Sequence, residues 1–210
     1  MRLYWHPFSI FPRRVRIALR EKAVPYEEVE IDLPGGATRG VEFRRLNPFG
    51  HVPVLEDDGL VIYESLAILE YLEERFPSPA LLPGDAAGRA RTRQLMFASG
   101  DYFAAPLKRW LTRLFTPKET WDRADQERAV VELGEHLDVL EPMLAGREYL
   151  VDGFSLADVA YAPLVADLDA CRLDHLLAER PAVRAWVERL RARPSVRATS
   201  PFSSAGGRTD

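Results

Sequence analysis

The sequence is poor in cysteine, in charge of one sign and in long apolar runs, and each shortage excludes a class of protein. Cys171 is the only cysteine among 210 residues, so neither an intrachain disulfide nor a multi-thiol metal site can form. The 28 lysines and arginines are interspersed with 32 aspartates and glutamates, whereas a nucleic-acid or membrane-surface binder normally carries a basic run. No apolar stretch approaches the roughly 20 residues that span a bilayer.

The remaining composition is that of an ordinary globular protein. Hydrophobic residues make up 47% of the chain and charged residues 29%, enough for one large domain or two modest ones. Strand-like residues begin at Arg2, directly after Met1, which leaves no room for a signal peptide. With the single cysteine, this predicts a cytoplasmic protein without a metal site.

The first part of the chain predicts a mixed sheet with helices packed on it. The expected elements are a strand over 2–5, a helix from just after Pro12, a strand over 26–31, an irregular segment from 34 to 47, strands over 51–56 and 60–62, and a helix from about Glu64. Asp57-Asp58-Gly59 between two apolar runs is a strong hairpin signal. One helix-linked strand pair and one hairpin predict a mixed four-stranded sheet.

The second part of the chain predicts helices only. Three prolines between Phe76 and Asp85 predict a linker over 77–86, because a helix cannot continue through them. Beyond it, apolar residues repeat at helical spacings of 3 and 4: Val130, Leu133, Leu137, Leu140 and Leu144. We therefore expect an α/β domain over 1–76, an all-helical domain over 87–199 and a flexible tail over 200–210.

Three segments, taken together, resemble the cytosolic glutathione transferase superfamily, and the resemblance covers nearly the whole chain. They are Ser9-Ile10-Phe11-Pro12-Arg13-Arg14-Val15-Arg16-Ile17-Ala18-Leu19, then Asn47-Pro48-Phe49-Gly50-His51-Val52-Pro53-Val54-Leu55 followed by Glu64-Ser65, and finally Ser155-Leu156-Ala157-Asp158. No segment is specific alone, but their order and separations are. The resemblance implies a thioredoxin-like N-terminal domain and an all-α C-terminal bundle, in a serine-type member (theta/zeta-like or a related bacterial branch).

The first segment is similar to the one that activates the glutathione thiol. A free thiol has a pKa of about 8.5, and lowering it by about two units needs roughly 2.7 kcal/mol of thiolate stabilisation. By resemblance, Ser9 donates a hydrogen bond to the sulfur at the positive end of a helix. Alone, Ser9 would be interpreted as a loop or capping residue. Tyr4 is the fallback, since other branches use a tyrosine near this strand, although such a tyrosine is more often core.

The second segment is similar to the part that holds the peptide. By resemblance, Val52 precedes a cis Pro53 and pairs with glutathione through its backbone, like an added strand. Glu64 would meet the ammonium of the γ-glutamyl group, and Ser65, at a helix N-terminus, its carboxylate; a plain helix cap is the alternative for Ser65. His51 would lie near the glycine carboxylate, or else be a surface residue.

Arginines in the first turns of the first helix are unusual, because the helix dipole disfavours cations there. They suggest an anion nearby, and Arg13 is a candidate glutathione contact, with a solvated basic face as the alternative. For Arg14 and Arg16 the solvated face is the favoured interpretation.

The second substrate is expected in a cleft between the domains. The candidate pocket residues are Phe11, Tyr102, Phe103, Trp110 and Phe115, with burial in the core as the alternative for each. Ser155 and Asp158 have capping-box spacing and are interpreted as structural. Cys171 is expected to be a buried apolar residue.

The resemblance implies an enzyme that uses glutathione as co-substrate to attack small hydrophobic electrophiles by conjugation, substitution, or reductive dehalogenation or ether cleavage. It also implies a homodimer, a role in detoxification, and no metal, nucleic-acid or membrane partner. The absence of a cysteine nucleophile argues against mixed-disulfide chemistry, and the absence of the serine-cysteine signature of maleylacetoacetate isomerases weakens an isomerase assignment. The alternative is a non-catalytic binding or protein-interaction protein on the same fold.

Overall fold

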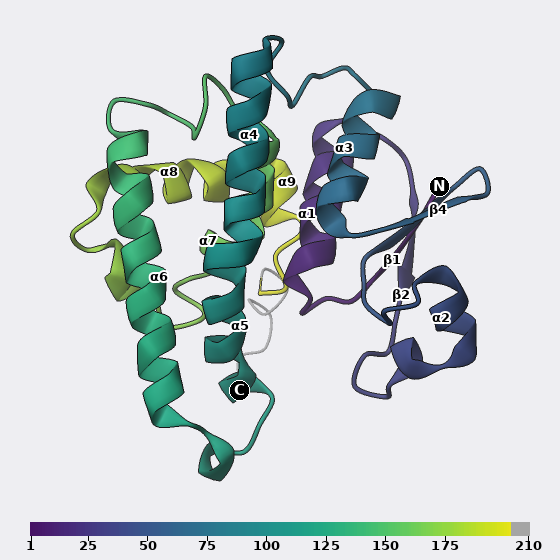
Figure 1. The fold of residues 1–210 in the computed structure, drawn as a ribbon, viewed down its shortest axis with the longest axis horizontal. Helices are drawn as coiled ribbons and strands as arrows, with labels where there is room; N and C mark the ends of the chain where they lie inside the picture. The colour runs from purple at the N-terminus through teal and green to yellow at the C-terminus, as the bar shows by residue number, and fades with distance from the viewer. Residues whose placement is uncertain (203–210) are drawn as a thin grey trace. The chain divides into compact units, whose positions relative to one another are not determined.

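The computed structural model describes residues 1–202 of the chain, which forms two compact units (Figure 1). Unit 1 comprises Met1–Leu81 together with the chain from Pro194, and unit 2 comprises Leu82–Arg193. None of the helices within the described residues has the length and apolar character needed to cross a bilayer.

Unit 1 is built on a sheet in the order β2-β1-β3-β4. Its elements are β1 (Arg2–Trp5), α1 (Ile10–Glu21), β2 (Glu27–Glu30), a 3-10 turn (Ala37–Arg39), α2 (Val41–Leu46), β3 (Val54–Asp57), β4 (Leu60–Tyr63), α3 (Ser65–Arg75) and α9 (Pro194–Arg197). β1 is parallel to β2 and antiparallel to β3, which is antiparallel to β4. This confirms the mixed four-stranded sheet.

The sheet is covered on both faces, because successive side chains of a strand point to opposite sides. Tyr4 and Val54 pack with Phe43 of α2 on one face. Leu3 and Leu55, one position away on each strand, are fully buried on the other. Helices α1 and α3 lie side by side over that second face (Figure 1).

Two expectations for unit 1 were wrong in detail. The segment expected to be irregular contains α2, a six-residue helix held by the burial of Phe43 rather than by its own propensity. Helix α1 begins at Ile10, before Pro12, because the first N–H groups of a helix have no intrahelical acceptor and proline is tolerated there. The hairpin is present, with positive φ angles of 48° at Asp58 and 86° at Gly59, as a type I′ turn requires.

The C-terminal segment was expected to belong with the helical domain up to residue 199, but residues from Pro194 group with unit 1. Polar contacts with α1 explain this. Ser195 donates to the Glu21 carboxylate, and Arg13 donates to the Val196 carbonyl at 3.2 Å. Of the tail expected over 200–210, residues 203–210 lie outside the described part of the chain.

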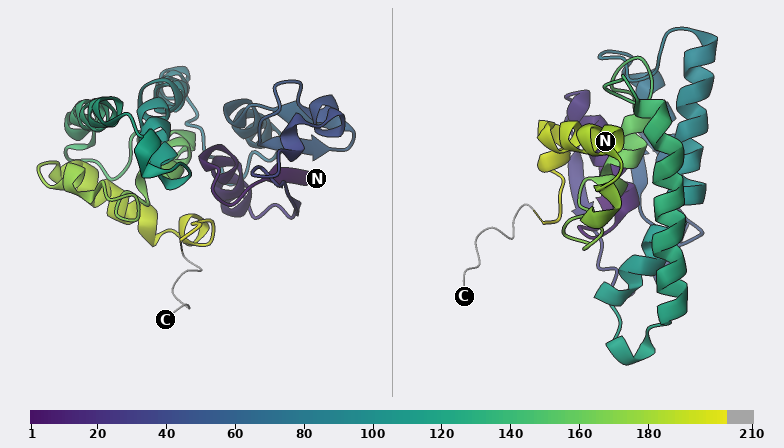
Figure 2. Two further views of the ribbon diagram at one scale, coloured as in Figure 1. Left: turned by 90° about the horizontal axis from the view of Figure 1, so that it is seen from below. Right: turned by 90° about the vertical axis from the view of Figure 1, so that its left-hand side faces the viewer.

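Unit 2 consists of helices, as expected. They are α4 (Ala86–Ala98), which continues through a π-helical segment (Ser99–Ala104) into α5 (Ala105–Leu111), 3-10 turns at Thr112–Leu114, Lys118–Thr120 and Asp174–Leu177, α6 (Arg123–Leu144), α7 (Leu156–Val165) and α8 (Pro181–Ala192). Helix α7 is buried throughout and packs against α4 and α8, while α6 packs against α5 and α8 (Figure 2). The repeated leucines of α6 face this core.

A capping box begins α7, as the Ser155-x-x-Asp158 spacing predicts. The Asp158 carboxylate accepts hydrogen bonds from the Ser155 N–H at 3.0 Å, the Leu150 N–H at 3.2 Å and the Trp186 indole at 2.9 Å. Burial raises the pKa of Asp158, against the effect of these donors. Asp158 therefore connects the start of α7 to α8, which is a structural role.

Candidate functional site

The turn after β1 leaves the hydroxyl of Ser9 available. The Ser9 N–H donates to the His6 carbonyl at 3.0 Å, and Ser9 is the N-cap residue of α1, with extended backbone (φ −93°, ψ 119°). Its side chain nevertheless makes no capping bond and no other hydrogen bond within residues 1–202. The first turn of α1 holds no acidic residue, so the positive helix end and the hydroxyl are both open to an anion.

Tyr4, the fallback donor, is already engaged. Its hydroxyl donates to Glu56 Oε2 at 3.0 Å, and its ring packs edge-on against Phe43 at 6.4 Å. Burial first, and then the Glu56 carboxylate, raise the pKa of Tyr4. Of these two hydroxyls, only that of Ser9 makes no hydrogen bond within the described residues.

Val52 lies where its backbone can meet a peptide. The β1–β3 pairing ends at Tyr4 and Val54, so the turn that carries Ser9 and the segment that contains Val52 both leave the sheet at this end. The Val52-Pro53 bond is cis, as the resemblance implies. Val52 is buried, yet it makes no hydrogen bond to any other residue of the described chain. Buried backbone groups are nearly always paired. The unpaired backbone groups of Val52 are therefore of the kind that pairs with an extended peptide.

Asn47 shapes the loop that leads to Val52. Its side chain donates to the His51 carbonyl at 2.7 Å and accepts from the Phe49 N–H at 3.0 Å, and it is only 1% exposed. His51 itself is exposed. The second of the three segments begins with Asn47, but the sequence pattern does not predict that Asn47 shapes this loop.

The N-terminus of α3 carries the second pair of candidate residues. Glu64, the N-cap, has φ 71° and ψ 112°, a strained conformation for a residue with a side chain, and its carboxylate makes no capping bond. Such strain persists only where surrounding structure imposes it, and it is most common at functional sites. Ser65 is buried and its Oγ accepts from Arg14 Nη1 at 3.4 Å, which joins the beginnings of α1 and α3.

The solvated basic face expected for α1 is wrong. Arg14 is 1% exposed and Arg16 is 8% exposed. Arg14 lies over the Phe11 ring at 5.0 Å, and Arg16 stacks on Trp5 at 3.8 Å and pairs with Glu28 at 2.9 Å. Guanidinium groups stack on aromatic rings and bind oxygens at their edge, so burial here is satisfied by partners that the helical pattern does not show.

Arg13 is bonded to the C-terminal segment. It is buried, and its guanidinium donates to Thr199 Oγ1 at 3.4 Å as well as to the Val196 carbonyl. The solvated face is therefore wrong for Arg13 too, and its contact with glutathione stays a prediction.

Phe103 is a core residue, not a pocket residue. It is fully buried, with its ring 5.4 Å from His136 and 6.3 Å from Tyr161. Trp110 is half-buried and donates to the Cys171 carbonyl at 3.0 Å. Cys171 was expected to be buried but is partly exposed. Of the other candidates, Phe11 packs on Arg14, whereas Tyr102 is 67% exposed and Phe115 66%.

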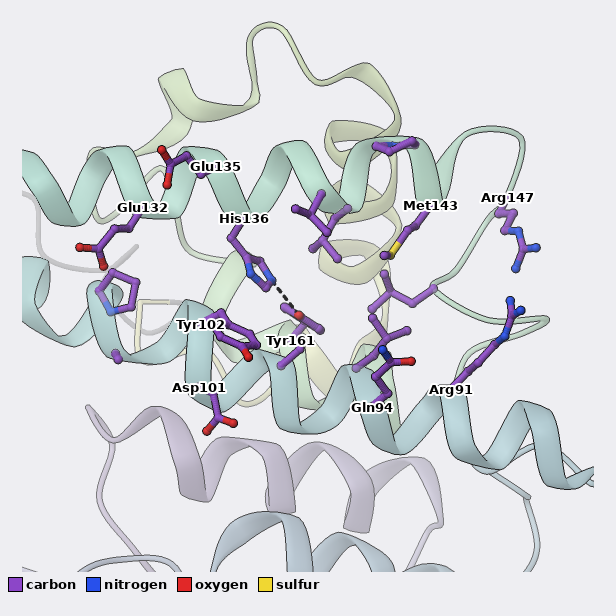
Figure 3. Close-up of a pocket in the computed structure, with 18 of the residues that line it drawn as sticks. Arg91, Gln94, Asp101, Tyr102, Glu132, Glu135, His136, Met143, Arg147 and Tyr161 are labelled. Carbon is purple, nitrogen blue, oxygen red and sulfur yellow. Dashed lines mark hydrogen bonds between the residues drawn. The ribbon is translucent and has the colours of Figure 1, made fainter.

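Unit 2 contains a cavity of about 1000 Å³ between α6 and the continuous helix formed by α4, the π-helical segment and α5 (Figure 3). The sequence pattern did not predict this cavity. Val139 and Met143 are among its apolar lining residues, and Arg91 and Arg147 face each other at one end. On its floor the His136 ring and the Tyr161 hydroxyl share a hydrogen bond of 2.8 Å. Burial lowers the pKa of His136, so this histidine is neutral near pH 7.

Comparisons with known proteins agree with the fold and the motifs. The family described as glutathione S-transferase, N-terminal domain, matches residues 8–75, and glutathione S-transferase, C-terminal domain, matches residues 103–194. Glutathione S-transferase 3 of Zea mays is 36% identical over 207 residues, covering 95% of this chain and 92% of that protein. Maleylacetoacetate isomerase of Rattus norvegicus is 39% identical over 166 residues, covering 77% and 74%. A glutathione transferase from Pseudomonas putida, with one glutathione disulfide bound per subunit, superposes with a TM-score of 0.85 at 26% identity, covering 94% and 89%.

Proposed function

The chain belongs to the glutathione transferase superfamily, and we propose that it activates glutathione through Ser9 for attack on small electrophiles. The observation that carries this proposal is the Ser9 hydroxyl, which stands at the N-cap of α1 without a capping bond. A free donor at a positive helix end stabilises a thiolate more than a thiol. The thiol pKa then falls, and a larger share of bound glutathione is nucleophilic at neutral pH.

The peptide is held by groups around the end of β1. The free N–H and C=O of Val52 pair with the cysteinyl backbone, as in strand addition. Ser65, polarised by Arg14, receives the γ-glutamyl carboxylate, and Glu64 receives the neighbouring ammonium. His51, exposed on the same loop, is proposed for the glycine carboxylate.

In the reaction a carbon–sulfur bond forms between the thiolate and the electrophile. In substitution a leaving group departs with its electron pair; in conjugate addition a proton from solvent completes the product. Ile10 follows Ser9, so the serine-cysteine signature of the isomerase branch is absent and we favour conjugation or substitution. Phe11 remains a proposed contact for the electrophile.

Glutathione affinity tests the binding half of this proposal. We expect Glu64→Gln and Ser65→Ala each to raise the Kd for glutathione about tenfold, since each removes one charge-assisted contact. The effect on kcat at saturating glutathione should be smaller, because both residues act far from the sulfur. Calorimetric titration gives the Kd, and turnover of an aromatic halide gives kcat.

Glu74→Gln is the matched control, because Glu74 is an exposed glutamate on the same helix. Its Kd should equal that of the wild type. An unchanged Kd in Glu64→Gln would exclude Glu64 from the site. Binding of glutathione by the wild type without turnover of any electrophile would favour the non-catalytic alternative.

We also propose a homodimer that buries the cavity face of unit 2. Tyr102, Val139 and Met143 line this cavity and are 44–67% exposed, and exposed apolar groups that lie together mark interaction sites. Val139→Glu, in the cavity wall, should shift the protein from dimer to monomer in light scattering, because it would bury an unpaired charge. Val131→Glu, equally exposed on α6 but outside the cavity, is the control and should stay dimeric. Dimers in both variants would exclude this face.

A cytoplasmic location and a role in detoxification complete the proposal. The single cysteine supports the cytoplasmic location. The family membership supports the role in detoxification.

A further inference from the structure

His6 holds the turn that presents Ser9 through two separate acceptors. Its backbone carbonyl accepts from the Ser9 N–H at 3.0 Å, which closes a four-residue turn. Its ring Nδ1 accepts from the Phe8 N–H at 3.3 Å. Both N–H groups that precede α1 are thus directed to one residue.

The ring contact replaces one that short polar side chains usually make. The first position of such turns favours aspartate, asparagine or serine, whose side chains accept from the N–H two residues on, and proline is favoured at the second position. Here Pro7 occupies the second position and the histidine ring supplies the acceptor. An accepting Nδ1 carries no proton, so the ring holds its proton on Nε2.

All four residues of the turn, His6 to Ser9, are at least partly exposed. The Phe8 side chain is 54% exposed, so burial of its ring does little to hold it, although the ring also contacts the His6 ring at 6.1 Å. The Ser9 hydroxyl makes no bond within the described chain that would fix its position. Where the hydroxyl points therefore depends on the backbone of the turn.

We propose that His6 is a positioning residue for thiolate formation: through Nδ1 it fixes the turn and thereby aims the Ser9 hydroxyl at the bound thiol. The β1–β3 pairing ends at Tyr4 and Val54, so His6 and Val52 both lie at this end of the sheet. Loss of the ring acceptor would leave Val52, Glu64 and Ser65 in place and displace only the hydroxyl. This inference rests on the proposed role of Ser9.

The test compares His6→Ala, His6→Asn and Ser9→Ala with the wild type in the full chain. The bound-thiol pKa is followed by thiolate absorbance against pH, glutathione affinity by calorimetry, and kcat with an aromatic halide. We expect His6→Ala to keep the Kd within about twofold, to raise the thiol pKa and to lower kcat about tenfold, because small displacements of a catalytic group are costly. His6→Asn should recover kcat to within about threefold, since asparagine supplies the same acceptor.

His175→Ala is the control, because His175 is an exposed histidine of unit 2, and it should match the wild type. If Ser9→Ala raises the thiol pKa but His6→Ala leaves the pKa and kcat unchanged, the positioning role is overturned and the proposed function stands. If Ser9→Ala itself leaves the thiol pKa unchanged, the proposed function fails first. Equal loss of glutathione affinity in both His6 variants would make His6 structural and overturn the inference.

Discussion

Ser9→Ala is expected to lower kcat about 25-fold at pH 7, the loss of thiolate that a two-unit rise in the thiol pKa produces there, and to leave the Kd for glutathione almost unchanged. A hydrogen bond to a charged acceptor contributes about 1.5–3 kcal/mol, and each 1.36 kcal/mol corresponds to a factor of ten in rate. The Ser9 hydroxyl makes no hydrogen bond within the described chain, and its backbone bond to His6 is kept in the variant, so the fold should be unaffected. Glutathione should still be held by Val52, Glu64 and Ser65.

The effect of Ser9→Ala should depend on pH in a defined direction. A donor to the thiolate lowers the thiol pKa, so the wild type keeps thiolate down to about pH 6.5, two units below a free thiol. Without the donor, thiolate forms only as the pH rises toward about 8.5. The activity ratio of wild type to variant should therefore be largest below pH 6.5, at about 100, and fall toward one above pH 9, as pH–rate profiles would show.

Tyr4→Phe is the matched control for this experiment. Because the Tyr4 hydroxyl donates to Glu56, its removal should leave the thiol pKa unchanged. The opposite result, activity retained in Ser9→Ala and lost in Tyr4→Phe, would transfer the catalytic role to the tyrosine.

Lys22→Met is expected to destabilise unit 1 by about 3–5 kcal/mol, the usual cost of breaking a buried ion pair by removing one partner. Lys22 Nζ lies 2.6 Å from Glu73 Oε2, with the lysine side chain 0% and the glutamate side chain 9% exposed. The same ammonium donates to the carbonyls of Phe76 at 2.7 Å and Pro79 at 2.9 Å. One charge therefore fastens the end of α1 to the end of α3 and to the chain that follows it.

The methionine variant removes the ammonium from the buried Glu73 carboxylate, which still accepts from the Leu81 N–H at 3.1 Å. Amide hydrogen exchange of α1 and α3 measures the loss, which should appear as exchange at least about 100-fold faster. Adding Glu73→Gln should restore part of the stability, because it removes a buried charge that has lost its ammonium and keeps an acceptor for Leu81. Lys118→Met, at an exposed lysine, is the control. Equal exchange in Lys22→Met and the control would show that the pair adds no net stability.

The sequence by itself determined the elements whose cause is local. Asp58-Gly59 predicts the hairpin because both residues tolerate positive φ. Ser155-x-x-Asp158 predicts the capping box because the two side chains satisfy neighbouring N–H groups. The run of prolines ends α3, and the leucine spacing predicts α6, since each acts through the backbone or the helical period. Three short motifs in order were enough to identify the superfamily.

Only the tertiary structure decided which groups are satisfied and which are left free. The same pattern of arginines along α1 fits a solvated face, yet Arg14 and Arg16 are buried because Ser65, Trp5 and Glu28 reach them from other elements. Helix α2 exists because Phe43 packs on the sheet. The unbonded hydroxyl of Ser9 follows from the geometry of the turn that His6 holds. These three features depend on contacts between residues distant in the chain or on the path of a turn. The spacing of residues within one segment predicts neither of these.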